Sequence, residues 1–110
     1  MADLVIKGGT VLDKSGSRKA DVAIGADGNI SQIGKDIDGE RVVDAAGCIV
    51  SSGLVDLNSD FCQPGNEEIE TIESGTRSAV LGGYTAVMLM PHTSPAIHSA
   101  AAVKEMQSLR

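Results

Sequence analysis

Two short stretches of the chain hold the side chains that could do chemistry. The first contains an amide at Asn58, a carboxylate at Asp60 and a thiol at Cys62, and the second contains His92, with His98 a little further along. Zinc takes carboxylate, imidazole and thiolate ligands, whereas harder cations prefer carboxylate and amide oxygens. One carboxylate and one amide make a poor cation site, and the spacing of the two histidines does not require a metal. A metal or catalytic site therefore stands beside a plainer alternative, a polar loop with hydrogen-bonding histidines.

The elements that position these residues follow the order strand, helix, strand, helix over residues 53–110, which is typical of an α/β unit with parallel strands. The apolar run at 54–57 predicts the first strand, and the run at 84–90 predicts a second strand, buried on both faces. Ligands collect at the carboxyl ends of parallel strands, so the residues after each run are the ones to examine. A second helix is predicted from about Ser99. The first helix, ended by two glycines at 82–83, is indicated by residues that recur at spacings of three and four: Ile69, Ile72, Thr76, Ala79 and Val80.

The first half of the chain, residues 1–52, is expected to form a small antiparallel β module. Turn residues separate its short apolar runs, and five or six strands are expected before Gly53. The strongest local signal is Asp27-Gly28, because both central residues of a type I′ hairpin turn need a positive φ, which Asp tolerates and Gly adopts freely.

Charge and composition exclude several classes of function. The chain has 110 residues with 15 acidic and 9 basic side chains, and residues 56–73 contain acids but no base, so the basic track that nucleic acid binding needs is missing. Residues 78–103 carry no charge, but glycines and prolines interrupt them, which indicates buried core rather than a membrane span. No secretory signal begins the chain, so we expect a cytoplasmic protein in which Cys48 and Cys62 are free thiols. Four acids are expected in or near the first turn of the first helix, where the helix dipole favours them: Glu67, Glu68, Glu70 and Glu73.

A series of short motifs runs through both halves of the chain in a fixed order. They are LVIKGGTVLD at 4–13, ADVAI at 20–24, DAAG at 44–47, GLVDL at 53–57, ETIESGTR at 70–77 and GGYT at 82–85. As an ordered series they resemble the start of a dihydroorotase, in the cyclic amidohydrolase group that includes dihydropyrimidinases and allantoinases. The resemblance implies an α/β fold. A small β-sandwich-type module over residues 1–52 would precede the first two strand–helix units of a TIM-barrel-like fold over residues 53–110, about two of eight units.

The site positions depart from the group's pattern. Active members carry a zinc-binding His-x-His pair at the end of the first barrel strand and a substrate-binding Arg shortly after it, where this chain has Asn58, Asp60 and Cys62. A substrate-contacting Asn after the second strand is replaced by His92. The resemblance thus implies that Asn58 and Asp60 are degenerate metal positions, and that Cys62 and His92 are degenerate substrate positions. The remaining ligands of the group come from later strands, so no catalytic residue is expected, and no cofactor is expected on this chain although the group uses zinc.

These departures imply a catalytically inactive homologue or fragment of the dihydroorotase group, possessing a structural or interaction role. The alternative is a metal-dependent hydrolase that opens a cyclic amide in pyrimidine biosynthesis, with a rebuilt site in which Asp60, His92 and His98 hold a metal between subunits. A third hypothesis is a truncated part of a longer homologue.

The expected partners follow from the incomplete barrel. An open pair of strands leaves sheet edges and one apolar helix face uncovered, so we expect self-association or a partner chain that covers them. Dihydroorotase homologues that lack the metal histidines serve in some bacteria as partners of aspartate carbamoyltransferase. The resemblance therefore suggests that enzyme as a partner of this chain. Neither nucleic acid nor a membrane is expected as a partner.

Overall fold

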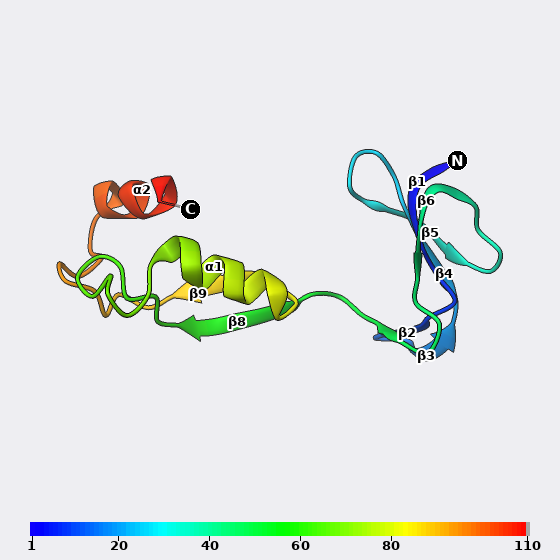
Figure 1. Cartoon of the computed structure of the whole chain (residues 1–110), viewed down its shortest axis with the longest axis horizontal. Helices are drawn as coiled ribbons and strands as arrows, with labels where there is room; N and C mark the ends of the chain where they lie inside the picture. The colour runs from blue at the N-terminus through cyan, green and yellow to red at the C-terminus, as the bar shows by residue number, and fades with distance from the viewer. Residues whose placement is uncertain (110) are drawn as a thin grey trace. The chain divides into compact units, whose positions relative to one another are not determined.

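The chain consists of two units, Met1–Ser52 and Gly53–Arg110. The computed structural model describes residues 1–109. Figure 1 labels its helices and strands and colours them from the N-terminus to the C-terminus. Strands make up the first unit, whereas strands and helices alternate in the second. This mixture confirms the α/β class expected from the sequence.

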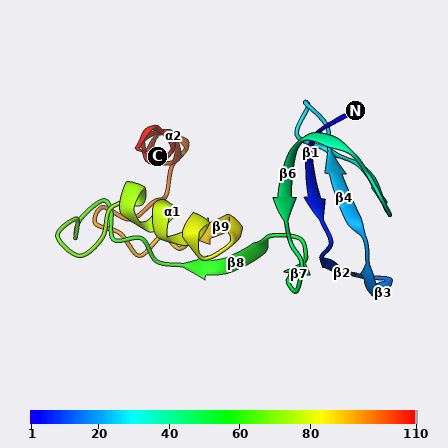
Figure 2. The ribbon, with the colours of Figure 1, turned by 45° about the vertical axis from the view of Figure 1, so that its right-hand side comes forward.

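The first unit contains seven strands in two sheets, and Figure 2 shows the larger sheet from its face. The larger sheet has the order β5-β4-β1-β6 and comprises β1 (Ala2–Lys7), β4 (Asp21–Ile24), β5 (Ile30–Gly34) and β6 (Gly39–Asp44). The smaller sheet has the order β3-β2-β7 and comprises β2 (Thr10–Asp13), β3 (Gly16–Lys19) and β7 (Ile49–Val50).

Both sheets are mixed, so the expectation of a purely antiparallel module with five or six strands is wrong. β1 pairs in parallel with β6, and β2 pairs in parallel with β7. The physical reason is that the turns after β1 and β6 do not form hairpins. Gly8 and Gly47, both at φ 77°, lead the chain from one sheet into the other. The unpredicted strand β3 has the sequence GSRK and is exposed throughout, so no apolar alternation marks it.

The turn between β4 and β5 is a hairpin, as expected, but its type differs. Gly28 has φ 79°, whereas Asp27 is not among the residues with positive φ. The Gly28 N–H donates to the Gly25 carbonyl oxygen at 2.9 Å, and the Gly25 N–H donates to the Asn29 carbonyl oxygen at 2.9 Å. This pattern is a type I turn followed by one left-handed residue, the other common hairpin solution, and it requires positive φ only of glycine.

Two small apolar clusters form the core of the first unit. Val5, Ala23 and Ile37 make up one, and Val11, Ala20 and Val22 the other. The buried residue Asp21 accepts the Gly8 N–H at 2.9 Å and the Ile37 N–H at 3.1 Å through its carboxylate. These hydrogen bonds are the largest causes of a lowered pKa at Asp21. One carboxylate thus ties the turn after β1 to the loop before β6.

The second unit confirms the expected order of strand, helix, strand and helix. β8 (Leu54–Ser59) pairs in parallel with β9 (Tyr84–Leu89). The helix α1 (Ile72–Leu81) lies between these strands in the sequence, and α2 (Ala100–Ser108) follows β9. Within residues 1–109, no helix is long and apolar enough to cross a membrane.

α1 begins later than its apolar spacing suggested. Thr71 is the N-cap: its side chain accepts the Ser74 N–H, and the Ser74 hydroxyl accepts the Thr71 N–H, so the two residues form a capping box. Ile69 therefore precedes the helix and is 73% exposed. Glu67, Glu68 and Glu70 precede it too, so only Glu73 of the four acids lies in its first turn.

β9 is not buried on both faces within this chain, contrary to the expectation. Tyr84 and Met88 are exposed, as are Val55 and Leu57 of β8. A parallel sheet normally has cover on both faces, but here α1 packs on β9 and α2 buries only Met106. Two strands and two helices are too few to enclose the apolar side chains that the sequence supplies.

Candidate functional site

The loops that follow β8 and β9 lie side by side at the carboxyl end of the two-stranded sheet. The Met90 N–H donates to the Ser59 carbonyl oxygen, and the Ser94 N–H donates to the Pro64 carbonyl oxygen, each at 2.9 Å. Gly65, at φ 120°, lies so close to Ser94 that a Cβ at Gly65 would come within 2.9 Å of the Ser94 carbonyl oxygen. The two loops are therefore joined by backbone contacts, and side chains from both can meet.

Asp60 and His92 meet across these loops. Nδ1 of His92 lies 3.2 Å from Oδ1 and 3.4 Å from Oδ2 of the Asp60 carboxylate. Both side chains are exposed, with 58% of Asp60 and 69% of His92 accessible. A carboxylate that faces Nδ1 favours a proton on that nitrogen and leaves Nε2 facing away from the pair.

Asn58 is placed differently from the expectation, because β8 runs through Ser59 and so includes Asn58. Its backbone N–H donates to Oδ1 of Asp56 at 2.9 Å, and the Ser59 hydroxyl donates to Oδ2 of Asp56 at 2.8 Å. These hydrogen bonds, the one from Asn58 first, lower the pKa of Asp56. The strand end is thus held by Asp56, which the sequence analysis missed although Asp with Asn and Ser two and three positions later is a common turn pattern.

Cys62 lies in the loop after β8 and is half-buried, with a free thiol. Its carbonyl oxygen accepts the Asn66 N–H at 2.8 Å. The neighbouring Gln63 has a clearer role, because its Oε1 accepts the Ile72 N–H at 3.0 Å. The first N–H groups of a helix need acceptors from outside it, and Gln63 supplies one for α1. Gln63 was not among the predicted residues, since nothing in its spacing marks this long-range contact.

His98 does not join the other candidates. Its Nδ1 lies 2.8 Å from the carbonyl oxygen of Ala96, two residues away, so its contact is local. In residues 1–109, no group of three or more His, Cys, Asp or Glu side chains is placed to hold a metal ion. A catalytic zinc needs three protein ligands, and the Asp60–His92 pair supplies two, so the residues present do not fit that metal. The metal and substrate roles of Asn58, Asp60, Cys62 and His92 stay predictions.

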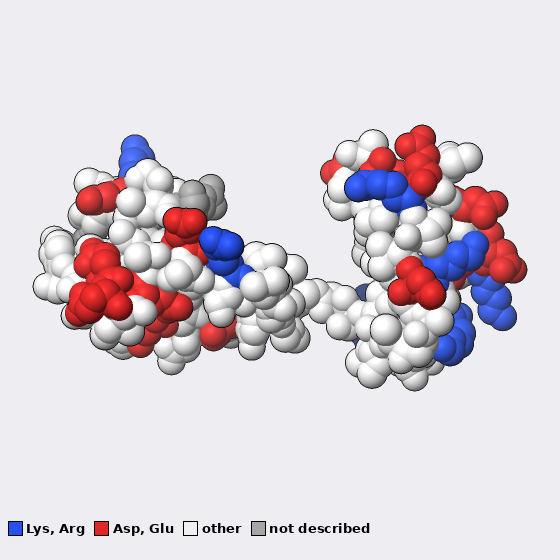
Figure 3. All heavy atoms as spheres, viewed as in Figure 1, with Lys and Arg blue, Asp and Glu red and all other residues white. Residues whose placement is uncertain are grey.

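The charge around the site is negative. Figure 3 shows acidic side chains gathered over one region of the second unit, whereas acidic and basic side chains are interspersed on the first. Glu67 and Glu68 are both exposed in the loop between β8 and α1. In the described part of the second unit the basic side chains are Arg77 and Lys104. Arg77 lies on α1, where Nη1 of its guanidinium is 3.9 Å from Oε1 of Glu73.

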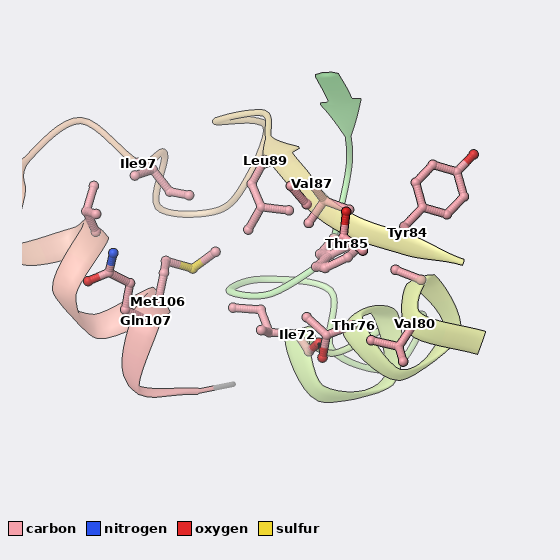
Figure 4. A pocket seen from close by; sticks show the side chains of 14 residues that line it. Ile72, Thr76, Val80, Tyr84, Thr85, Val87, Leu89, Ile97, Met106 and Gln107 are labelled. Atoms are coloured by element: carbon pink, nitrogen blue, oxygen red, sulfur yellow. Dashed lines mark hydrogen bonds between the residues drawn. The ribbon is translucent and has the colours of Figure 1, made fainter. Parts of the chain in front are cut away.

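An apolar hollow of about 560 Å³ lies between β9, α1 and α2. The close view in Figure 4 shows Ile72 of α1, Val87 and Leu89 of β9 and Met106 of α2 directed into it. Its lining is mostly carbon, and neither Asp60 nor His92 belongs to it. Phe61 and Ile97, from the segments that follow β8 and β9, also line the hollow.

Comparison with known proteins gives consistent relatives. The chain is 46% identical over 104 residues to a dihydroorotase of Ruminiclostridium cellulolyticum, covering 92% of this chain and 24% of that protein. It is 45% identical over 94 residues to a dihydroorotase of Bacillus subtilis, covering 83% of this chain and 22% of that protein. An allantoinase of Escherichia coli O1:K1 is 43% identical over 90 residues, covering 81% and 20%. The chain thus spans about a quarter of the length of the curated relatives it matches.

Solved structures share the fold. The L-hydantoinase (dihydropyrimidinase) of Arthrobacter aurescens matches with a TM-score of 0.83 at 26% identity, over 99% of this chain and 25% of its own. A D-hydantoinase of Bacillus sp. AR9 matches with a TM-score of 0.77 at 26% identity, over 96% and 24%. The sequence profile of the family described as Dihydro-orotase-like matches residues 47–109, which is more than half of the chain. The chain belongs to the dihydroorotase-like family of the amidohydrolase superfamily.

Proposed function

We propose that this chain is a structural or interaction module of the dihydroorotase-like family and that its own residues do not hydrolyse a cyclic amide. One observation carries the proposal: the Asp60 carboxylate and the His92 imidazole contact each other at 3.2 Å across the two loops. In the group that the sequence resembles, the corresponding positions serve a metal and a substrate. Here the two side chains satisfy one another, so their polar atoms hold the loops together.

The chemistry of the substituted residues supports the same conclusion. A zinc site that generates hydroxide needs a nearly complete set of protein ligands, and Asn58 is a weak replacement for an imidazole. Cys62 in place of an Arg removes both a positive charge and a planar fork that binds a carboxylate through two hydrogen bonds. Both the metal and the substrate would therefore lose contacts that the active members of the group possess.

The test is an assay of ring opening with the purified chain. Dihydroorotate and a hydantoin are incubated with the protein and zinc, and the open-chain acid is measured against a protein-free control. We expect no reaction above the control and no stoichiometric zinc after dialysis. Zinc-dependent opening by the chain would overturn the proposal.

A second candidate function is the metal-dependent hydrolysis of a cyclic amide, as in pyrimidine biosynthesis, at a rebuilt site shared between subunits. The observation that favours it is the same proximity, since Asp60 and His92 are two groups of ligating type already side by side. It predicts stoichiometric metal that is lost in both Asp60→Ala and His92→Ala and retained in Glu73→Ala, a matched exposed acid. A folded, metal-free protein under zinc excess would end this alternative.

We further propose that another polypeptide covers the β8–β9 sheet, in the cytoplasm. Val55, Leu57 and Met88 are 59%, 66% and 55% exposed, whereas parallel strands are normally covered on both faces. A second copy of the chain is the first candidate, and aspartate carbamoyltransferase, suggested by the resemblance, is the second. Light scattering behind a sizing column measures the mass of the chain alone and of the chain mixed with that enzyme. A multiple of the single-chain mass, reduced in Leu57→Lys, supports the proposal, and a stable monomer in both samples opposes it.

A further inference from the structure

Two Asp-Gly steps occur in the chain, Asp27-Gly28 and Asp38-Gly39, and both lie in the first unit. The structure holds their side chains in opposite ways. We propose that Asp38 is a site of spontaneous isoaspartate formation in the folded protein and that Asp27, with the same following residue, is protected by its hydrogen bonds. This inference is independent of the proposed function.

The reaction needs only the peptide and water. The backbone nitrogen of the glycine attacks Cγ of the aspartic acid, the N–Cγ bond forms, and the acid hydroxyl leaves with the amide proton as water, which closes a succinimide ring. Water then adds to one of the two ring carbonyls and breaks its bond to nitrogen. When the main-chain carbonyl is the one released, the backbone continues through Cβ and Cγ, and the mass is unchanged. A glycine in the second position leaves the attacking nitrogen free of a neighbouring Cβ.

At Asp27, hydrogen bonds engage both carboxylate oxygens and also the nitrogen of Gly28 that would attack. Its Oδ1 accepts the Asn29 N–H at 3.1 Å, and its Oδ2 accepts the Asn29 side-chain amide at 2.9 Å. The attacking nitrogen, that of Gly28, donates its proton to the Gly25 carbonyl oxygen at 2.9 Å. The hydrogen bonds from Asn29, the side-chain one first, also lower the pKa of Asp27, which disfavours the protonated acid that loses water.

Within residues 1–109, the Asp38 carboxylate lacks side-chain hydrogen bonds of the kind that hold Asp27. Its side chain is 89% exposed, and its ion pair with Lys7 has a long separation of 3.7 Å. No hydrogen bond from the described residues restrains its carboxylate, so its side chain can rotate more freely than that of Asp27. The residue lies in the connection between the buried Ile37 and the start of β6 at Gly39.

The modification would lengthen the backbone between two fixed points. Before Asp38, the Ile37 N–H donates to the Asp21 carboxylate at 3.1 Å. The Ile37 carbonyl oxygen accepts a hydrogen bond from Nζ of Lys7 at 3.2 Å. After it, Gly39 packs so closely on Val5 that a Cβ would come within 2.5 Å of the Val5 Cγ2. One added methylene between these anchors displaces the start of β6 against β1, so the modified chain is expected to unfold more easily than the unmodified one.

Tryptic mapping tests the proposal within one sample, because cleavage after Lys19, Lys35 and Arg41 places the two steps in separate peptides, 20–35 and 36–41. The folded protein is aged at mildly acidic pH, where part of the aspartic acid is protonated, a second sample is aged at the same pH in concentrated urea, and isoaspartate is quantified by methyltransferase labelling and fragment-ion mapping. We expect peptide 36–41 to exceed peptide 20–35 several-fold in the folded sample and the difference to shrink in urea. Equal rates in the folded protein, or the same ratio in urea, would overturn the proposal.

Two variants test the role of the hydrogen bond to Asp27 and the identity of the reacting residue in peptide 36–41. Asn29→Ala removes the side-chain hydrogen bond to Asp27 and should raise isoaspartate in peptide 20–35 while leaving peptide 36–41 unchanged. Asp38→Glu should remove the signal from peptide 36–41, since glutamate would need a larger ring. No increase at Asp27 in Asn29→Ala would show that the side-chain hydrogen bond does not protect it, contrary to the proposal.

Discussion

Asp60 and His92 are 32 positions apart in the sequence, and in the structure the carboxylate Oδ1 of one lies 3.2 Å from the imidazole Nδ1 of the other. Each belongs to a loop that follows one strand of the parallel pair β8–β9. The contact joins the two loops through side chains as well as through their backbones. It also defines the first experiment, because both partners are exposed and neither is needed to fill the core.

A double-mutant cycle with Asp60→Asn and His92→Gln is expected to give a small coupling free energy, about 0.2–1 kcal/mol, since exposed side-chain contacts gain little in water. The free energies of unfolding from urea titration near neutral pH measure it. The matched control is the exposed pair of Glu73 and Arg77, with 3.9 Å between their charged atoms, for which a smaller coupling is expected. A coupling of zero for Asp60 and His92 would mean that the contact does not hold the loops.

Asp21→Asn is expected to destabilise the first unit, because an amide has one acceptor oxygen where the carboxylate accepts both the Gly8 and Ile37 N–H groups. The pH dependence has a definite sign. The folded-state pKa of Asp21 lies below the ordinary value of 3.8, so the stabilisation is present above that value and is lost as the pH falls through the folded pKa. Thermal unfolding across the acidic range should show a steeper loss of stability in the parent than in Asp21→Asn. Glu40→Gln, the same change of charge on exposed β6, should leave the profile nearly unaltered.

Gly39→Ala is expected to cost about 1–3 kcal/mol of stability, the usual range for overpacking a core. Its Cβ would come within 2.5 Å of Cγ2 of Val5, which is fully buried, and within 3.1 Å of the Ala2 carbonyl oxygen. Gly34→Ala is the control, because its nearest contacts would be ordinary ones of 3.6 Å and 3.8 Å. Equal stabilities of the two variants in chemical unfolding would contradict the packing argument.

Gly75→Ala is expected to destabilise the second unit even though alanine favours helices by about 1 kcal/mol over glycine. The added Cβ would lie 2.9 Å from ring atoms of Phe61, whose loop packs against the buried face of α1 at this position. Phe61→Leu in the same chain should recover much of the lost stability by removing the ring atoms. Unfolding of the single and double variants checks this, and a Gly75→Ala chain more stable than its parent would disprove the close contact.

The sequence by itself determined the elements of the second unit and their order. Period-three and period-four spacing marked α1, and continuous apolar runs marked β8 and β9, because these patterns depend only on neighbours along the chain. The family motifs identified the fold, since many positions have to agree at once. The resemblance also marked Asn58, Asp60 and Cys62 as departures from the group's pattern, and their roles stay predictions.

The tertiary structure decided what depends on contacts far apart in the sequence. The parallel pairing of β1 with β6 and of β2 with β7 follows from two turns that cross between sheets, which no local pattern reveals. The start of α1 was set by the capping box of Thr71 and Ser74 and by Gln63, which accepts the Ile72 N–H, rather than by the apolar face. The Asp60–His92 contact and the different surroundings of Asp27 and Asp38 arise in the same way. Residue types limit which hydrogen bonds can form, but only the folded backbone brings a donor and an acceptor within reach of each other.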